Sequence, residues 1–159
     1  MTGERFSGLK VPFRLTYFTF LQQLDAEGMQ AVAVVRKLKK GDQILVSNEY
    51  GNLRDSSSEM FTQFIGILLD SSDVIFNAER TTNVNTIGTI TYSSVDVNHG
   101  NGMSASEGIF TAPVTGTYYF HFQGVSDHNS RKDLYLNFYH DGTLVSSSYK
   151  RFVSSTFNI

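Results

Sequence analysis

The sequence contains no cysteine among its 159 residues, which excludes disulfide bonds and zinc sites built on thiolates. This absence is compatible with either side of a membrane and does not fix the compartment. Charged residues are also scarce, at 18%, and the formal net charge is -2. Nucleic-acid binding is not expected, because it needs clustered lysine and arginine. The one cationic cluster, at 36–40, lies beside a turn and is expected to be a solvated rim.

Long apolar runs are missing as well. No stretch of about 18 apolar residues occurs, so membrane insertion is not expected. The apolar segment 13–24 is interrupted by Arg14, Gln22 and Gln23 and lacks a small-residue cleavage site. A signal peptide is therefore not expected within this chain.

Aromatic residues are abundant, with 13 Phe and 8 Tyr but no Trp. Together with many Thr, Val, Ser and Gly they favour strands and turns. Runs of alternating or continuous apolar residues predict short strands. A helix is a competing prediction only at 29–40, and there the β-branched residues favour a strand. Asp141-Gly142 predicts a type I′ hairpin. The predicted strands are 31–38, 43–47, 60–69, 74–82, 89–97, 117–122, 134–139 and one that begins at 144.

The alternation also separates a predicted core from a predicted interface. The inward positions are expected to be core, because each buried aromatic ring removes about 150–250 Å² from water. The outward positions Tyr119, His121, Tyr135 and Tyr139 are candidates for a subunit interface, with a second core layer as the alternative. The inward set is Phe64, Tyr118, Phe120, Phe122, Leu134 and Leu136.

The segment 108–120, GIFTAPVTGTYYF, resembles the signature of the complement C1q globular-head family. The segments 74–80, 90–98 and 134–142 resemble the other early strands of that domain. On this resemblance Gly108, Phe110, Pro113 and Gly116 join the predicted core.

The late strands of the same domain come first in this chain. The segment 32–46, with its Gly-Asp turn, and the segment 61–69 resemble those strands. Residues 1–70 therefore resemble the C-terminal half of a C1q-like domain, with a degenerate signature strand near 8–21, and residues 71–159 resemble the N-terminal half. Three accounts are open: a fragment of a tandem protein, a circular permutation, or a misassembled gene model. The echo of the signature at 11–20, which shares the pattern around Pro113, favours the tandem fragment.

The resemblance implies an all-β jelly-roll β-sandwich of the C1q/TNF-like kind, with about ten strands. It also implies a secreted, non-enzymatic homotrimer that binds protein or glycan ligands through loops, as in innate-immune pattern recognition. One alternative is a TNF-like secreted signalling ligand that binds a receptor between subunits. Another is an incomplete fragment without independent function. Some family members bind calcium, and Asp25 and Glu27 are the candidate ligands here, although calcium needs six or more oxygen ligands.

Catalytic and metal motifs are otherwise missing from the sequence. It has no His-Glu-x-x-His and no Gly-x-Ser-x-Gly pattern, so an enzyme is not expected. His121 and His140 could approach only if their strands were neighbours, and a packed or interface role is the commoner one for a strand histidine. The candidate ligand loops are 51–59, 99–102 and 126–132.

Overall fold

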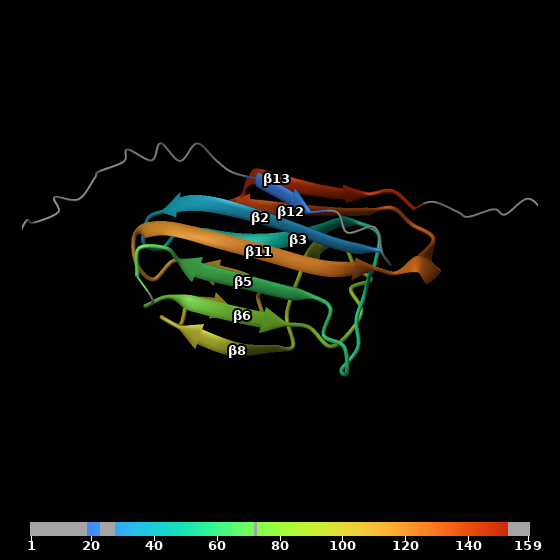
Figure 1. Cartoon of the computed structure of the whole chain (residues 1–159), viewed down its shortest axis with the longest axis horizontal. Helices are drawn as coiled ribbons and strands as arrows, with labels where there is room; N and C mark the ends of the chain where they lie inside the picture. The colour runs from blue at the N-terminus through green and yellow to red at the C-terminus, as the bar shows by residue number, and fades with distance from the viewer. Residues whose placement is uncertain (1–18, 23–27, 72, 153–159) are drawn as a thin grey trace, which may run out of the picture.

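The computed structural model describes residues 19–22, 28–71 and 73–152, and for 19–22 it describes the backbone only. The described residues form thirteen strands and one 3₁₀ turn, with no α-helix (Figure 1). The strands are β1 Thr19–Gln22, β2 Met29–Leu38, β3 Gln43–Tyr50, β4 Leu53–Arg54, β5 Gln63–Leu68, β6 Ile75–Glu79, β7 Gly88–Thr89, β8 Ser94–His99, β9 Met103–Ser104, β10 Ile109–Thr111, β11 Gly116–Ser126, β12 Leu134–His140 and β13 Thr143–Lys150. The turn η1 is His128–Ser130.

The strands pack as two antiparallel sheets. The first sheet has the order β1-β2-β11-β5-β6-β8, and β4 pairs with β11. The second has the order β13-β12-β3-β10-β9, and β7 pairs with β3. The predicted jelly-roll β-sandwich is confirmed. The structure has more strands than the expected ten because β4, β7 and β9 are two-residue strands that sequence alternation does not reveal.

The early and late parts of the chain share both sheets. Strand β11 lies between β2 and β5, with ten residue pairs to β2 and six to β5. Strand β12 lies between β3 and β13. The segments 28–71 and 73–152 therefore build one sandwich and not two separate bodies (Figure 1).

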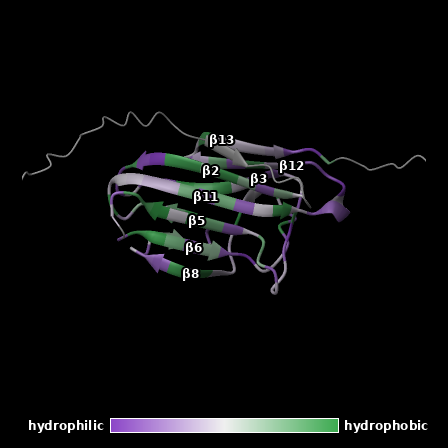
Figure 2. Cartoon of the chain, in the orientation of Figure 1, coloured by the Kyte–Doolittle hydropathy of each residue, from purple (hydrophilic) through white to green (hydrophobic). Residues whose placement is uncertain are grey.

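The core fills the space between the sheets. Phe64 from β5 lies with its ring centroid 4.9 Å from that of Phe76 and 6.0 Å from that of Phe120. The ring of Phe110 stacks on Phe76 at 4.9 Å. These four rings are at most 1% exposed, and the hydropathy colouring shows apolar residues along β2, β5 and β6 (Figure 2). Edge-to-face and offset contacts of this kind add to the stability gained by burying the rings.

Two predicted strands differ from the observed ones. The predicted strand 89–97 is divided between β7 and β8, which lie in different sheets, because the chain crosses the sandwich through buried Ile90 and Tyr92. The predicted strand 60–69 begins only at Gln63. The buried Asp55 carboxylate accepts backbone hydrogen bonds from Ser56, Phe61 and Thr62, and these bonds hold the preceding residues in a loop. Asx-type bonds of this kind compete with strand pairing.

Candidate functional site

The outward side of the first sheet carries an apolar surface over its central strands. Because side chains alternate along β11, Tyr119 and His121 point away from the core that holds Tyr118 and Phe120. The pairing register places further apolar side chains beside them, and no described strand covers this side. We call this surface the apolar face: Val35, Ile65, Ile67, Ile75 and Tyr119, with His121 beside Ile65.

A polar network bounds the apolar face along one margin. The Gln63 side-chain amide donates to the Glu79 carboxylate at 3.2 Å, and that of Asn77 donates to the same oxygen at 3.0 Å. Gln123 donates to the Gln63 side-chain oxygen at 3.2 Å. Glu79 is only 7% exposed, so these bonds compensate a buried carboxylate. The apolar face therefore has a defined edge, as protein interaction surfaces have.

The four predicted interface residues do not lie on one surface. Tyr119 and His121 belong to β11 in the first sheet, whereas Tyr135 and Tyr139 belong to β12 in the second sheet. The outward sides of the two sheets are on opposite sides of the sandwich, so the four residues form two pairs that face away from each other. The sequence could not show this, because sheet membership depends on long-range strand pairing.

The outward side of the second sheet carries a row of tyrosines. Tyr135 is paired with Tyr50 on one side and Tyr149 on the other, and the three are 37%, 51% and 54% exposed. The Tyr149 hydroxyl donates to Asp133 at 2.6 Å. This bond lowers the pKa of the Asp133 carboxyl and raises the pKa of the Tyr149 hydroxyl, because it favours the charged acid and the neutral phenol.

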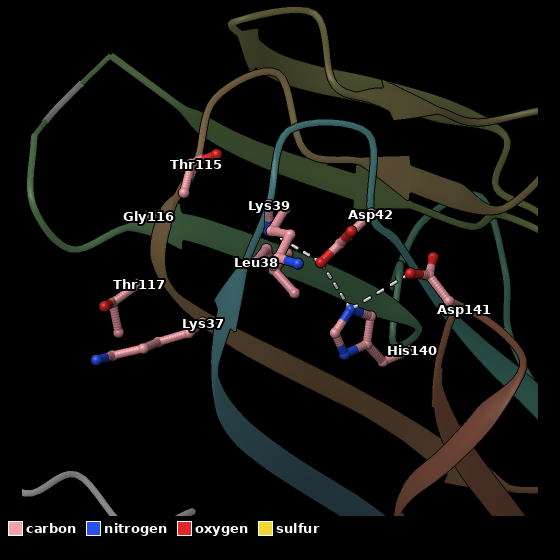
Figure 3. Close-up of a pocket in the computed structure, with 9 residues that line it drawn as sticks. All are labelled: Lys37, Leu38, Lys39, Asp42, Thr115, Gly116, Thr117, His140 and Asp141. Carbon is pink, nitrogen blue, oxygen red and sulfur yellow. Dashed lines mark hydrogen bonds and ion pairs between the residues drawn. The ribbon is translucent and has the colours of Figure 1, made fainter.

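A pocket of about 580 Å³ lies at the end of the sandwich where β2 ends and β11 begins (Figure 3). His140 from β12 points into it between two aspartates from two turns. Its Nε2 lies 3.0 Å from Asp42 Oδ2 and 3.6 Å from Asp141 Oδ2. The rest of the lining consists of Leu38, Gly116, two threonines and two exposed lysines: Thr115, Thr117, Lys37 and Lys39.

Hydrogen bonds hold the two aspartates of the pocket in place. Asp42 Oδ2 accepts from the Lys39 backbone N–H at 2.9 Å, and Asp141 Oδ1 accepts from the Gln43 backbone N–H at 2.7 Å. The Lys39 N–H, and then the His140 ring, lower the pKa of the Asp42 carboxyl. Asp42 is therefore ionised near neutral pH.

The predicted pair of His121 and His140 does not meet, since the two residues lie in different sheets. The cluster around His140 was missed in the sequence because Asp42 stands 98 residues away. Both aspartates were recognised only as turn residues. The two turns come together because β3 pairs with β12, and this pairing cannot be read from the sequence.

The structure buries most of the predicted core positions, but not all of them. Pro113 and Gly116 are partly exposed at the end of the sandwich beside the pocket. The calcium candidates Asp25 and Glu27 lie outside the described residues. The buried members of the predicted core are Phe64, Gly108, Phe110, Tyr118, Phe120, Phe122, Leu134 and Leu136.

The candidate ligand loops lie at both ends of the sandwich. Loops 51–59 and 126–132 lie together, since the Asp127 N–H donates to the Asn52 carbonyl at 2.9 Å. Loop 99–102 is at the other end, where Gly100 approaches Val74 and Pro113. Among the described residues no helix is long and apolar enough to cross a membrane.

Comparison with known proteins decides the family. The model of the C1q domain matches residues 75–158, just over half of the chain. The chain belongs to the C1q domain family. The match contains the signature segment 108–120 but not residues 1–74. The assignment of residues 1–70 to the C-terminal half of a C1q domain therefore remains a prediction.

Two curated relatives of this C1q chain carry the same name, complement C1q tumor necrosis factor-related protein 3, from Homo sapiens and Mus musculus. Each is 38% identical to it over 60 residues, which is 38% of this chain. The aligned segment covers 24% of each relative, so the chain matches only about a quarter of their length. No solved structure matches the chain.

Proposed function

We propose that this chain forms a non-enzymatic, secreted recognition module of the C1q type that assembles as a homotrimer and binds protein or glycan ligands through its loops. The apolar face is the observation that carries the proposal. A sandwich that worked as a monomer would leave Val35, Ile67 and Tyr119 in contact with water. Exposed apolar patches with a polar margin mark protein interaction surfaces.

The two outward surfaces suit a three-fold assembly. In a cyclic trimer each subunit uses two different surfaces, one to receive a neighbour and one to be received. Tyr119 lies on the first sheet and Tyr135 on the second, on opposite sides of the subunit. In such a trimer the Tyr119 surface of one subunit can contact the Tyr135 surface of the next. Tyrosine suits both surfaces because its ring is apolar and its hydroxyl can stay hydrogen-bonded.

Ile67→Glu is expected to convert the trimer into monomers. The substitution places a charge in the middle of the apolar face, beside Tyr119 and Ile75, where it would be desolvated on assembly. Size-exclusion chromatography with light scattering should show the wild type at three times the chain mass of 17.8 kDa and the variant at that mass.

Ile87→Glu is the matched control for this substitution. Ile87 is 70% exposed and lies outside the apolar face, so the same chemical change should leave the trimer intact. Circular dichroism separates dissociation from unfolding in both variants. A wild-type protein that is folded and monomeric would contradict the trimer. Wild-type and Ile67→Glu protein can also be compared on immobilised bacterial polysaccharide, where loss of trimerisation should weaken binding through loss of avidity.

We also propose that residues 28–71 and 73–152 are the complementary parts of one C1q-type sandwich in circularly shifted order. The position of β11 between β2 and β5 supports this proposal. The linker supports it too, because β5 and β6 are antiparallel neighbours and the Leu68 N–H donates to the Val74 carbonyl at 2.9 Å. A short turn can therefore join the end of one part to the start of the other.

Cleavage of the linker is expected to leave the two parts associated. A protease site introduced between Ser71 and Asp73 would be cut without removing any of the β2–β11 and β5–β11 ladder pairs. The fragments should elute together on size exclusion and separate only in denaturant. Uncut protein with the same inserted site is the control, and fragments that separate in native buffer would refute the single sandwich.

A further inference from the structure

The geometry points to a binding site for a zinc-like divalent metal ion at Asp42, His140 and Asp141. One ligand atom from each of the three side chains lies within 4.8 Å of the other two. They meet at the pocket of Figure 3, where the His140 ring is directed towards both carboxylates. None of the three side chains belongs to the apolar face.

The two distances from His140 suit tetrahedral coordination, and the ligand oxygens of Asp42 and Asp141 lie within 4.8 Å of each other. Zinc lies about 2.0–2.2 Å from imidazole nitrogen and carboxylate oxygen, so two of its ligand atoms stand about 3.3–3.5 Å apart. His140 Nε2 stands 3.0 Å from Asp42 Oδ2 and 3.6 Å from Asp141 Oδ2. Shifts of a few tenths of an ångström would bring both pairs to the required spacing.

The surroundings already orient the ligands. Asp42 and Asp141 each accept a backbone N–H, from Lys39 and Gln43 respectively. Metal-binding carboxylates are commonly held by second hydrogen bonds of this kind, which fix their direction before the ion arrives. Because Asp42 belongs to the turn before β3 and His140 ends the neighbouring strand β12, the ligands sit on paired elements of the sheet.

The chemistry of the three side chains selects the class of ion. Calcium prefers six or more oxygen ligands, whereas this cluster offers one nitrogen and two carboxylates. Imidazole favours zinc, copper, nickel or iron over calcium and magnesium. Two carboxylates also supply the negative charge that compensates a divalent cation. The pocket leaves room for water or an anionic ligand group to complete the coordination.

A bound ion would connect the two segments of the chain. Asp42 comes from the segment 28–71, and His140 and Asp141 come from the segment 73–152. The ion would therefore fix the early turn against the β12–β13 hairpin at one end of the sandwich. Ions that bind only the folded state raise its stability.

Titration of untagged, chelator-treated protein with Zn²⁺ in a calorimeter tests the site. The wild type should bind one equivalent per chain, and Co²⁺ in place of Zn²⁺ should give the visible absorption of tetrahedral coordination. His140→Gln should weaken Zn²⁺ binding by at least about 100-fold, since even loss of a residue that only supports a ligand weakens metal affinity by about 10–100-fold. Zn²⁺ should raise the melting temperature of the wild type but not of this variant.

Two further variants make the result decisive. Asp141→Asn keeps the side-chain oxygen that accepts the Gln43 N–H, so the turn is retained while Zn²⁺ binding falls. His128→Gln removes an exposed imidazole at the opposite end of the sandwich and should bind Zn²⁺ like the wild type. Wild-type protein without Zn²⁺ binding, or His140→Gln protein with unchanged binding, would overturn the metal site and leave the trimer proposal untouched.

Discussion

Phe120→Ala is expected to lower the free energy of unfolding by about 3–5 kcal/mol, the usual range for removing a fully buried phenylalanine. Phe120 is 0% exposed, and its ring lies 6.0 Å from that of Phe64 and 5.4 Å from that of Phe110. The cavity would open between two sheets that cannot close over it without moving β11. Many domains have little more stability than this in total.

The same substitution tests whether the early and late segments unfold together. Phe120 and Phe64 come from different segments but share one core, so chemical denaturation should show a single transition at lower denaturant concentration. Leu144→Ala, at a position that is 51% exposed, is the control and should change stability by less than about 0.5 kcal/mol. Two separate transitions, only one of which shifts, would show that the segments fold as independent bodies.

Gly108→Ala is expected to destabilise the sandwich by about 2–5 kcal/mol, as the sum of backbone strain and overpacking. Gly108 has φ +70°, a conformation that side chains disfavour by about 1–2 kcal/mol. A Cβ atom there would also overlap the Ile90 carbonyl oxygen. That oxygen belongs to the backbone, so it cannot rotate out of the way.

Gly142→Ala separates these two effects. Gly142 has nearly the same φ, +75°, but a Cβ atom there would meet no atom within 4 Å. Its replacement should lower the free energy of unfolding by only about 1–2 kcal/mol, from strain alone. Urea denaturation of both variants measures the difference, which the overlap at Ile90 predicts to be about 1–3 kcal/mol. Equal effects would contradict the close approach of β10 and the Ile90 crossing.

Local chemistry was sufficient to predict many of the elements. The alternation of Tyr118, Phe120 and Phe122 identified β11, because one side of that strand faces the core. Asp141-Gly142 predicted the β12–β13 hairpin, and both residues have the positive φ that a type I′ turn requires. The segment 108–120 indicated the family through its resemblance to the C1q signature, and the structure shows that a side chain at Gly108 would overlap the Ile90 carbonyl oxygen.

Pairing between distant strands could not be predicted in the same way. No local pattern shows that β12 pairs with β3, so the meeting of His140 with Asp42 was missed. For the same reason Tyr119 and Tyr135 were predicted to share one interface surface, although they lie on opposite sides of the sandwich. The predicted strand 89–97 was wrong because apolar Ile90 and Tyr92 belong to a crossing between sheets and not to one continuous strand.

The central place of β11 has a consequence for the order of events during synthesis. Strands β2 and β5 emerge from the ribosome first, yet the strand that separates them is complete only at Ser126. Until then both carry open edges that can associate with other nascent chains. The first sheet can therefore close only after contacts between distant residues have formed, and such contacts slow folding.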